Sequence, residues 1–224
     1  MNQQKKMSES LYTAFLLAIV GGFLDAYSYI VRGHVFANAQ TGNIVLLALN
    51  LAKSNFSLAF YYLIPILAFI TGTLTTEILK YLFYKNRFIH WRQIILLVEV
   101  LFLIIVSFLP NGSMNSFANI ILSFVCSMQV QSFRKINGNS YATTMCTGNL
   151  RSGTEQLFSF LLTKEKAHVY KCFSYFGVIV FFLLGAYVGS FLISYFGIKS
   201  ILFCCILLMA VCILLSPSIS LPEQ

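Results

Sequence analysis

Long apolar stretches limit how this sequence can fold more than any other feature. A helix that crosses a bilayer needs about 20 apolar residues. Six stretches reach or approach that length: roughly 11–31, 57–84, 92–110, 116–136, 169–196 and 198–217. Only 10% of the 224 residues are charged, against about 25% in soluble domains, and burial in lipid explains the deficit. The sequence therefore predicts an all-α transmembrane protein with about six spanning helices and the lipid bilayer as a partner.

The charged residues and cysteines exclude several other classes of protein. The net charge is +8, but the basic residues form short clusters between apolar stretches, as membrane topology places them, so we expect no nucleic-acid partner. None of the six cysteines forms a CxxC pair, which argues against a zinc site and a disulfide framework. The sequence contains no nucleophile–base motif and no phosphate-binding P-loop. We therefore expect no enzyme activity, no cofactor and no metal.

Two shorter segments, 43–52 and 150–162, begin alike. The residues that lead into them, 33–43 and 138–149, align with one inserted residue, and each contains a glycine, an aromatic-Ala pair and a Thr-Gly-Asn turn in that order. The first short segment has only ten residues, which as a helix cover about half a bilayer. Each segment follows one apolar stretch and precedes two more, so the order of elements is repeated.

This shared order predicts a tandem duplication, with a first membrane repeat at 1–110 and a second at 111–224. The stretch after each short segment carries small residues one turn apart, which let helices approach closely in lipid. These pairs are Gly72 with Thr76 and Gly185 with Gly189. The halves join near Pro110-Asn111-Gly112-Ser113, a strong turn signal.

Basic residues in short loops mark the cytoplasmic side of a membrane protein. If each half has three spanning helices and one short broken or re-entrant helix, most basic residues share the cytoplasmic side with both termini. These residues are Lys5, Lys6, Lys80, Lys85, Arg87, Arg92, Arg134, Lys135, Lys164, Lys166 and Lys171. Three spans in each half would make the two repeats inverted, a construction that recurs in secondary transporters. The sequence leaves open whether the short helices re-enter the membrane or span it.

The two Thr-Gly-Asn turns form the candidate solute site. A helix N-terminus offers unpaired N–H groups and about half a positive charge, so two such ends that meet in the bilayer would suit a small polar or anionic solute. The alternative is that each turn is only a helix cap. The candidate substrate-binding residues are Thr41, Gly42, Asn43, Thr147, Gly148 and Asn149, with Asn38 and Gln129 from the same signature segments.

Three ionisable residues are candidates for a coupling or proton-linked role. Asp25 lies deep in the first stretch, where an acidic residue costs about 3 kcal/mol, so we expect it to face the protein or water. It either carries a proton, binds a cation, pairs with Arg32 or His34, or satisfies an internal hydrogen bond. Glu99 is either a functional carboxyl or a packing residue. His34 either titrates near neutral pH or bonds a nearby backbone group.

The residues at 22–26, 33–38 and 41–43 resemble the first half of the YoaK-like family of uncharacterised bacterial multi-pass membrane proteins. Residues 128–129, 134–135 and 143–149 resemble the second signature of that family. The resemblance covers nearly the whole chain and implies a multi-pass protein of the bacterial inner membrane. It implies no substrate, because the family is one of unknown function.

Two classes of function fit these observations. The first is a small secondary transporter or permease for a small polar or anionic solute. The second is a non-transporting membrane scaffold or assembly partner, in which the small-residue faces around Gly72 and Gly185 would form a homo-oligomer. A water-accessible cavity between the two turns would favour the first class, and a dry, packed centre would favour the second.

Overall fold

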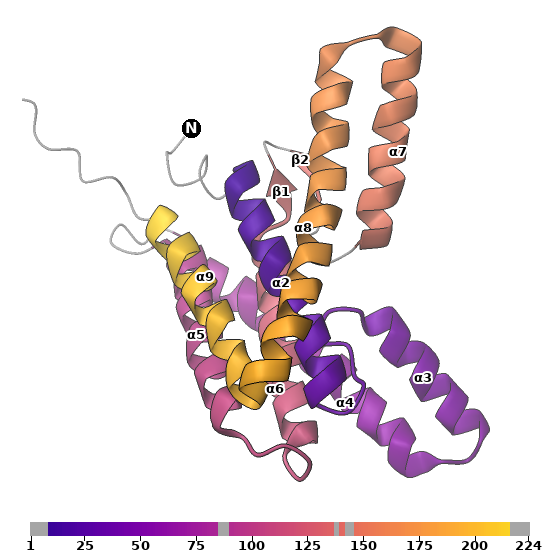
Figure 1. Cartoon of the computed structure of the whole chain (residues 1–224), viewed down its shortest axis with the longest axis vertical. Helices are drawn as coiled ribbons and strands as arrows, with labels where there is room; N and C mark the ends of the chain where they lie inside the picture. The colour runs from indigo at the N-terminus through magenta and orange to yellow at the C-terminus, as the bar shows by residue number, and fades with distance from the viewer. Residues whose placement is uncertain (1–8, 85–89, 137–138, 142–145, 216–224) are drawn as a thin grey trace, which may run out of the picture.

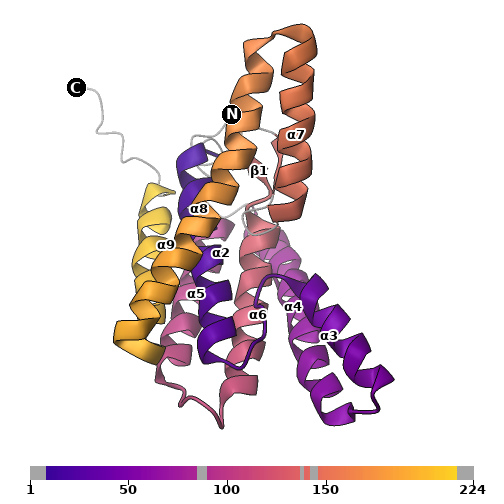
Figure 2. The same cartoon turned by 45° about the vertical axis from the view of Figure 1, so that its right-hand side comes forward.

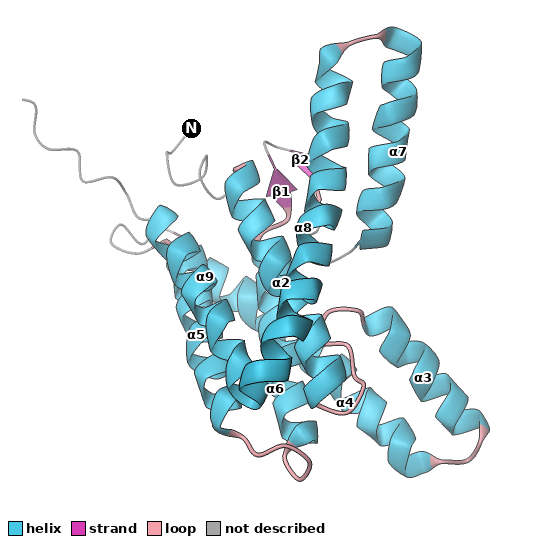
Figure 3. Cartoon of the chain, viewed as in Figure 1, coloured by secondary structure: helices cyan, strands magenta, loops and turns pink. Residues whose placement is uncertain are grey.

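The computed structural model describes residues 9–84, 90–136, 139–141 and 146–215. Nearly all of them are helical (Figure 3), as predicted. The helices are α2 (Leu11–Val31), α3 (Gln40–Ala52), α4 (Phe56–Phe83), α5 (Trp91–Phe108), α6 (Asn115–Ser132), α7 (Cys146–Thr163), α8 (Lys166–Phe196), the 3-10 helix η1 (Gly197–Ile201) and α9 (Leu202–Leu214). A two-residue antiparallel pair, β1 (Lys135–Ile136) with β2 (Asn139–Ser140), precedes α7. Lys5, Lys6, Lys85, Arg87, Gly138, Thr143 and Thr144 lie outside the described residues.

Among the described residues, four helical segments are long and apolar enough to cross a membrane: α2, α4, α5 and the continuous segment Lys166–Leu214, which joins α8, η1 and α9. Helix α3 is apolar but has only 13 residues. Helix α6 is not among the four, because polar residues such as Asn119 and Gln129 interrupt its apolar character. These two side chains are buried, so α6 turns its polar groups towards other helices.

The outer faces of α4 and α8 are covered by large apolar side chains. Phe60 and Leu74 on α4, and Leu183 and Phe191 on α8, are each more than half exposed. A soluble monomer rarely exposes so continuous an apolar surface. Lipid is the environment that satisfies it, which agrees with an integral membrane protein.

Local side-chain caps fix where two of the helices begin. Ser10 starts α2, since its Oγ accepts the Thr13 N–H at 3.2 Å. His90 starts α5 in a capping box, in which its Nδ1 accepts the Arg92 N–H at 3.2 Å and Gln93 Oε1 accepts the His90 N–H at 3.1 Å. Burial, with a smaller effect of Arg92, lowers the pKa of His90 to about 4 and keeps the imidazole neutral, as an acceptor must be.

Helices α2 and α6 lie at the centre of the bundle and pack mainly on other helices. α2 packs on α8 and α9, while α6 packs on α4 and α5. Between them, α5 packs on α9. Two hairpins, α3 with α4 and α7 with α8, extend away from this centre in different directions (Figures 1 and 2).

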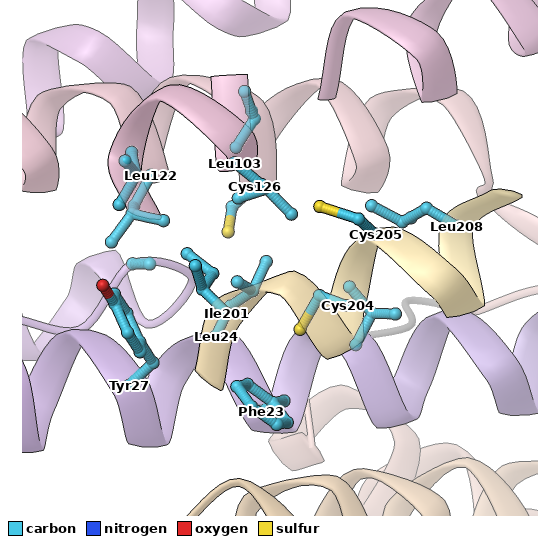
Figure 4. Close-up of a cluster of buried hydrophobic side chains, with 14 of the residues drawn as sticks. Phe23, Leu24, Tyr27, Leu103, Leu122, Cys126, Ile201, Cys204, Cys205 and Leu208 are labelled. Atoms are coloured by element: carbon cyan, nitrogen blue, oxygen red, sulfur yellow. The ribbon is translucent and has the colours of Figure 1, made fainter. Parts of the chain in front are cut away.

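The core between α2, α5, α6 and α9 is apolar and contains free thiols (Figure 4). Phe23 and Leu24 of α2, Leu103 of α5, Cys126 of α6 and Cys204 of α9 all belong to this core. Tyr27 belongs to the same core and lies nearer the C-terminal end of α2. Its hydroxyl donates to Ile198 O at 3.0 Å.

Glycines allow the central helices to touch their neighbours backbone to backbone. A Cβ at Gly185 of α8 would overlap Ile19 O of α2, and one at Gly22 of α2 would overlap Phe182 O of α8. Gly72 of α4 has the same relation to α6, where a Cβ would overlap Phe124 O. Small residues are what membrane helices need for such close packing.

Arg32 joins the ends of α2 and α5. Its side chain is fully buried, and Nη2 donates to Val106 O at 2.9 Å and to the Tyr27 hydroxyl at 2.8 Å, while Nη1 donates to Leu109 O at 3.1 Å. The carbonyls at the end of α5 carry the negative end of the helix dipole, which suits a guanidinium. Arg32 therefore binds α5 and does not pair with Asp25, one of the alternatives that the sequence left open.

We expect Gly185→Ala to lower the melting temperature of the purified protein. The added methyl group overlaps the Ile19 carbonyl, and overpacking of this kind costs about 1–3 kcal/mol, equivalent to several degrees in a protein of this size. Gly148→Ala is the matched control, because a Cβ there would meet no other described part of the chain within 4 Å. Equal melting temperatures for Gly185→Ala and wild type in detergent would contradict the close approach of α2 and α8.

Candidate functional site

A cavity of about 750 Å³ lies beside α2, where the first residues of α3 and α7 come together. We call it the Asp25 cavity. Its polar lining is Asp25 of α2, Asn38 of the α2–α3 loop, Gln40 and Thr41 of α3, and Cys146, Thr147 and Gly148 of α7. Its apolar lining includes Tyr29, Phe36, Phe69, Val130, Phe182 and Ala186. The volume falls in the range of small-molecule sites.

Asp25 is 7% exposed and lies against the loop that leads into α3. Its Oδ1 accepts the Asn38 N–H at 2.8 Å and the Asn38 side-chain amide at 3.4 Å. The Ala37 N–H also approaches this carboxyl. No described residue forms an ion pair with Asp25, so the bonds from this loop are its protein partners.

Asn38 connects the loop to α2 and leaves one acceptor unused. Its Nδ2 donates to Gly21 O at 3.2 Å as well as to Asp25. Its Oδ1 is buried and has no hydrogen-bond partner among the described residues. A buried acceptor without a partner is costly, so the Asn38 amide is an incompletely satisfied group next to Asp25.

The starts of α3 and α7 contribute positive potential to the same cavity. At α3, two N–H groups already bond the preceding loop, Gln40 N to Asn38 O and Gly42 N to Ala39 O, each at 3.0 Å. No side chain caps this end. It therefore acts on the cavity through its dipole and the Thr41 side chain, while α7 presents Thr147 and Gly148.

The cavity contains only part of the predicted solute-binding set. Of that set, Asn38, Thr41, Thr147 and Gly148 line it, and so does Asp25, the predicted coupling residue. Residues of the two Thr-Gly-Asn triplets, which are far apart in the sequence, thus line one cavity. The triplets are not turns, because they form the first turns of α3 and α7.

The other predicted residues lie outside the lining. Asn43 is buried and donates to Phe36 O at 2.8 Å and to Gln40 Oε1 at 3.0 Å, so it supports the loop rather than facing the cavity. Gln129 is buried in α6 and donates to Leu17 O at 3.1 Å. Asn149 is also buried. Gly42 faces the Phe36 ring, which would lie 3.5 Å from an added Cβ.

The remaining ionisable candidates, His34 and Glu99, do not line the cavity. His34 is exposed, has a φ of 62°, and places its ring edge-on to Tyr29 with centroids 4.7 Å apart. Glu99 is fully buried in α5, and neither of its oxygens has a hydrogen-bond partner among the described residues. It lies within electrostatic range of Cys126, Cys204 and Cys205, on the core side of α6 and α9.

The aromatic part of the lining was missed by the analysis of the sequence. Phe36 stands in the aligned aromatic-Ala pair and could have been found there. Phe69 and Phe182 are ordinary phenylalanines in apolar stretches. Only the packing of α4 and α8 against the centre selects them, so no local pattern distinguishes them from lipid-facing residues.

The family described as proteins of unknown function, DUF1275, matches residues 13–214. The chain belongs to the DUF1275 family. The match runs from the first turn of α2 to the end of α9, so it includes the Asp25 cavity.

Among curated relatives, this DUF1275 protein is similar to the UPF0700 transmembrane protein YoaK of Bacillus subtilis (strain 168). The two are 27% identical over an alignment of 157 residues, and the match covers 67% of this chain and 68% of the relative. The resemblance to a YoaK-like family is thereby confirmed, and so is the membrane character of the chain. No solved structure matches the sequence.

We expect Cys146 to react with small, charged methanethiosulfonate reagents. It is partly exposed and lines the cavity, so water in the cavity would carry the reagent to it. The test uses variants that retain a single cysteine, with mass spectrometry as the readout. Cys126, which is 1% exposed, is the control and should remain unmodified. A Cys146 thiol as inert as Cys126 would mean that the cavity is dry.

Proposed function

We propose that this DUF1275 protein is a small secondary transporter or permease. Its solute is a small polar or anionic molecule that binds in the Asp25 cavity, between the starts of α3 and α7. The cavity itself is the observation that carries this proposal, because two helix N-termini and an intramembrane carboxyl converge on one space large enough for a solute. Such convergence of broken helices is typical of transporter binding sites.

We further propose that the chain consists of two inverted repeats of three spanning helices, with α3 and α7 as broken or re-entrant helices. The helix contacts support this arrangement. In this arrangement α2, α3, α4 and α5 correspond to α6, α7, α8 and α9. The contact of α2 with α8 then corresponds to that of α6 with α4, and the contact of α3 with α4 to that of α7 with α8. The contact of α5 with α6 corresponds to that of α9 with α2. Every one of these contacts has its counterpart when the halves are exchanged. From their starts at the cavity, α3 and α7 run in opposite directions (Figure 2).

The closest helix contacts support the same equivalence. Gly185 faces Ile19 O, and Gly72 faces Phe124 O. Ile19 and Phe124 each lie seventeen residues before the aromatic-Ala pair that aligns the two halves. Equivalent glycines thus contact equivalent carbonyls, as a duplicated unit would require.

The proposed location is the cell membrane, with both termini on the cytoplasmic side. The charged contacts agree with the positive-inside rule. Glu9, just before α2, interacts with Arg92 at the start of α5, and Glu77 near the end of α4 interacts with Lys80 and Arg134. Basic residues from three elements therefore gather at the end of the bundle where the described chain begins.

A membrane scaffold or assembly partner is the second candidate function. Its interface would use the small-residue faces around Gly72 and Gly185. Those faces already contact α6 and α2 of the same chain, so they are not open to a second copy. A site on the cavity therefore accounts for more of the structure than an interface on the glycines.

Filling the cavity should remove solute binding without preventing folding. We expect Gly148→Trp to place its ring in open space and to abolish both uptake into reconstituted vesicles and ligand-induced thermal stabilisation. The probes are chloride, nitrate, sulfate, phosphate, acetate and benzoate. A bound probe at about 100 times its Kd stabilises by about 2.7 kcal/mol.

The control is Leu183→Trp, which places the same side chain on the exposed face of α8. It should bind and transport as the wild type does. Uptake that persists unchanged in Gly148→Trp would contradict a site in the cavity. The scaffold would be favoured by two results together. The wild type would neither transport nor bind any of the probes, and its Cys146 thiol would stay unlabelled.

A further inference from the structure

We infer that the Asp25 cavity binds a small organic carboxylate together with a proton, and that the proton is held on Asp25. This inference rests on the proposed function, since it names the solute class and the coupling ion of the same site. It follows from the charge balance of the cavity and from the kind of side chains that surround it.

The charges that face the cavity nearly cancel when Asp25 is ionised. Each helix N-terminus carries about half a positive charge, and the starts of both α3 and α7 line the space. The ionised Asp25 carboxyl contributes one negative charge, with no cationic side chain among the described residues of the lining. In this state the chain's own carboxylate occupies the place that a bound anion would take.

Protonation of Asp25 changes what the cavity attracts. The neutral acid no longer offsets the two helix ends, so they present a net positive potential to a solute. Proton and anion thus favour each other, and linkage requires that each raise the affinity for the other by the same factor. Asn38, whose N–H and side-chain amide donate to the Asp25 carboxyl, also carries a buried Oδ1 without a partner among the described residues.

Other groups near Asp25 do not provide the same switch. The thiols of Cys126 on α6 and Cys146 on α7 lie within electrostatic range of Asp25, but thiols are ordinarily neutral at pH 7. α4 and α8 present Phe69 and Phe182, which do not titrate. Arg32 is engaged with the end of α5.

The apolar lining limits the body of the solute. Phe36, Phe69 and Phe182 come from three different parts of the fold and face one space together with Tyr29. Rings of this kind pack on an apolar or aromatic body, whereas inorganic anions would find little to bind there. A carboxylate with a small apolar body suits both the positive helix ends and the aromatic side chains of the lining.

The test is calorimetric binding of benzoate to the purified protein, at about pH 8 and about pH 6, where benzoate stays ionised. We expect binding about tenfold or more tighter at the lower pH, with uptake of up to one proton per benzoate. Benzylamine and benzamide have similar bodies with a positive and a neutral group, and they should bind more weakly than benzoate at the lower pH.

Asp25→Asn keeps an oxygen that can accept the Asn38 N–H and removes the proton site. It should bind benzoate with equal affinity at both pH values and without proton uptake. Glu77→Gln is the control, because it removes an exposed carboxylate that pairs with Lys80 at the end of α4, and its pH dependence should remain that of the wild type.

The outcomes separate this inference from the proposed function. Benzoate binding that is independent of pH, or that stays pH-dependent in Asp25→Asn, overturns the proton-linked site, and so does a pH dependence lost only in Glu99→Gln. Preferential binding of benzylamine, or no binding of benzoate at either pH, overturns the solute class. In each of these cases the response of uptake to Gly148→Trp still decides whether the cavity is a transport site.

Discussion

The structure depends on how the irregular backbone between α2 and α3 is satisfied inside a membrane. Lipid offers no hydrogen bonds, so irregular backbone at membrane depth has to bond other parts of the protein or line a water-filled cavity. Ser28 Oγ accepts the Ala37 N–H at 3.2 Å, and Asp25 Oδ1 accepts the Asn38 N–H at 2.8 Å. α2 thus supplies the acceptors that hold the loop, and the loop sets where α3 begins. The Asp25 carboxyl, which bonds the loop between α2 and α3, is also the charged group of the cavity.

The same constraint explains why polar residues lie at the centre and apolar ones outside. α6 carries buried amides and hydroxyls that bond neighbouring backbone, such as Gln129 to Leu17 O and Asn119 to Arg32 O. α4 and α8 shield this polar centre with faces that suit lipid. A solute-sized space that combines a few polar groups with an aromatic lining can then exist between the helices. The proposed permease needs such a space, and a purely structural bundle does not require it.

Much of this architecture was predictable from the sequence. The apolar stretches and the inward position of Asp25 follow from bilayer thickness and the cost of a charge in lipid. The Thr-Gly-Asn triplets were predicted as turns before short helices, but they form the first turns of α3 and of the 18-residue α7. The roles of single residues were harder to assign. Asn43 supports the loop through Phe36 O, and Phe182 reaches the cavity because Gly22 lets α8 touch α2. Both depend on contacts between distant segments, and no spacing along the chain encodes them.

The central claim is that the starts of α3 and α7 face each other across one cavity, and cross-linking tests it most directly. In a background without other cysteines, the native Cys146 is combined with Thr41→Cys, and a short bifunctional methanethiosulfonate reagent is added to membranes. We expect an intramolecular cross-link between the two short helices, seen as a linked peptide by mass spectrometry. Modification of each thiol singly, with no link between them, would contradict the shared site.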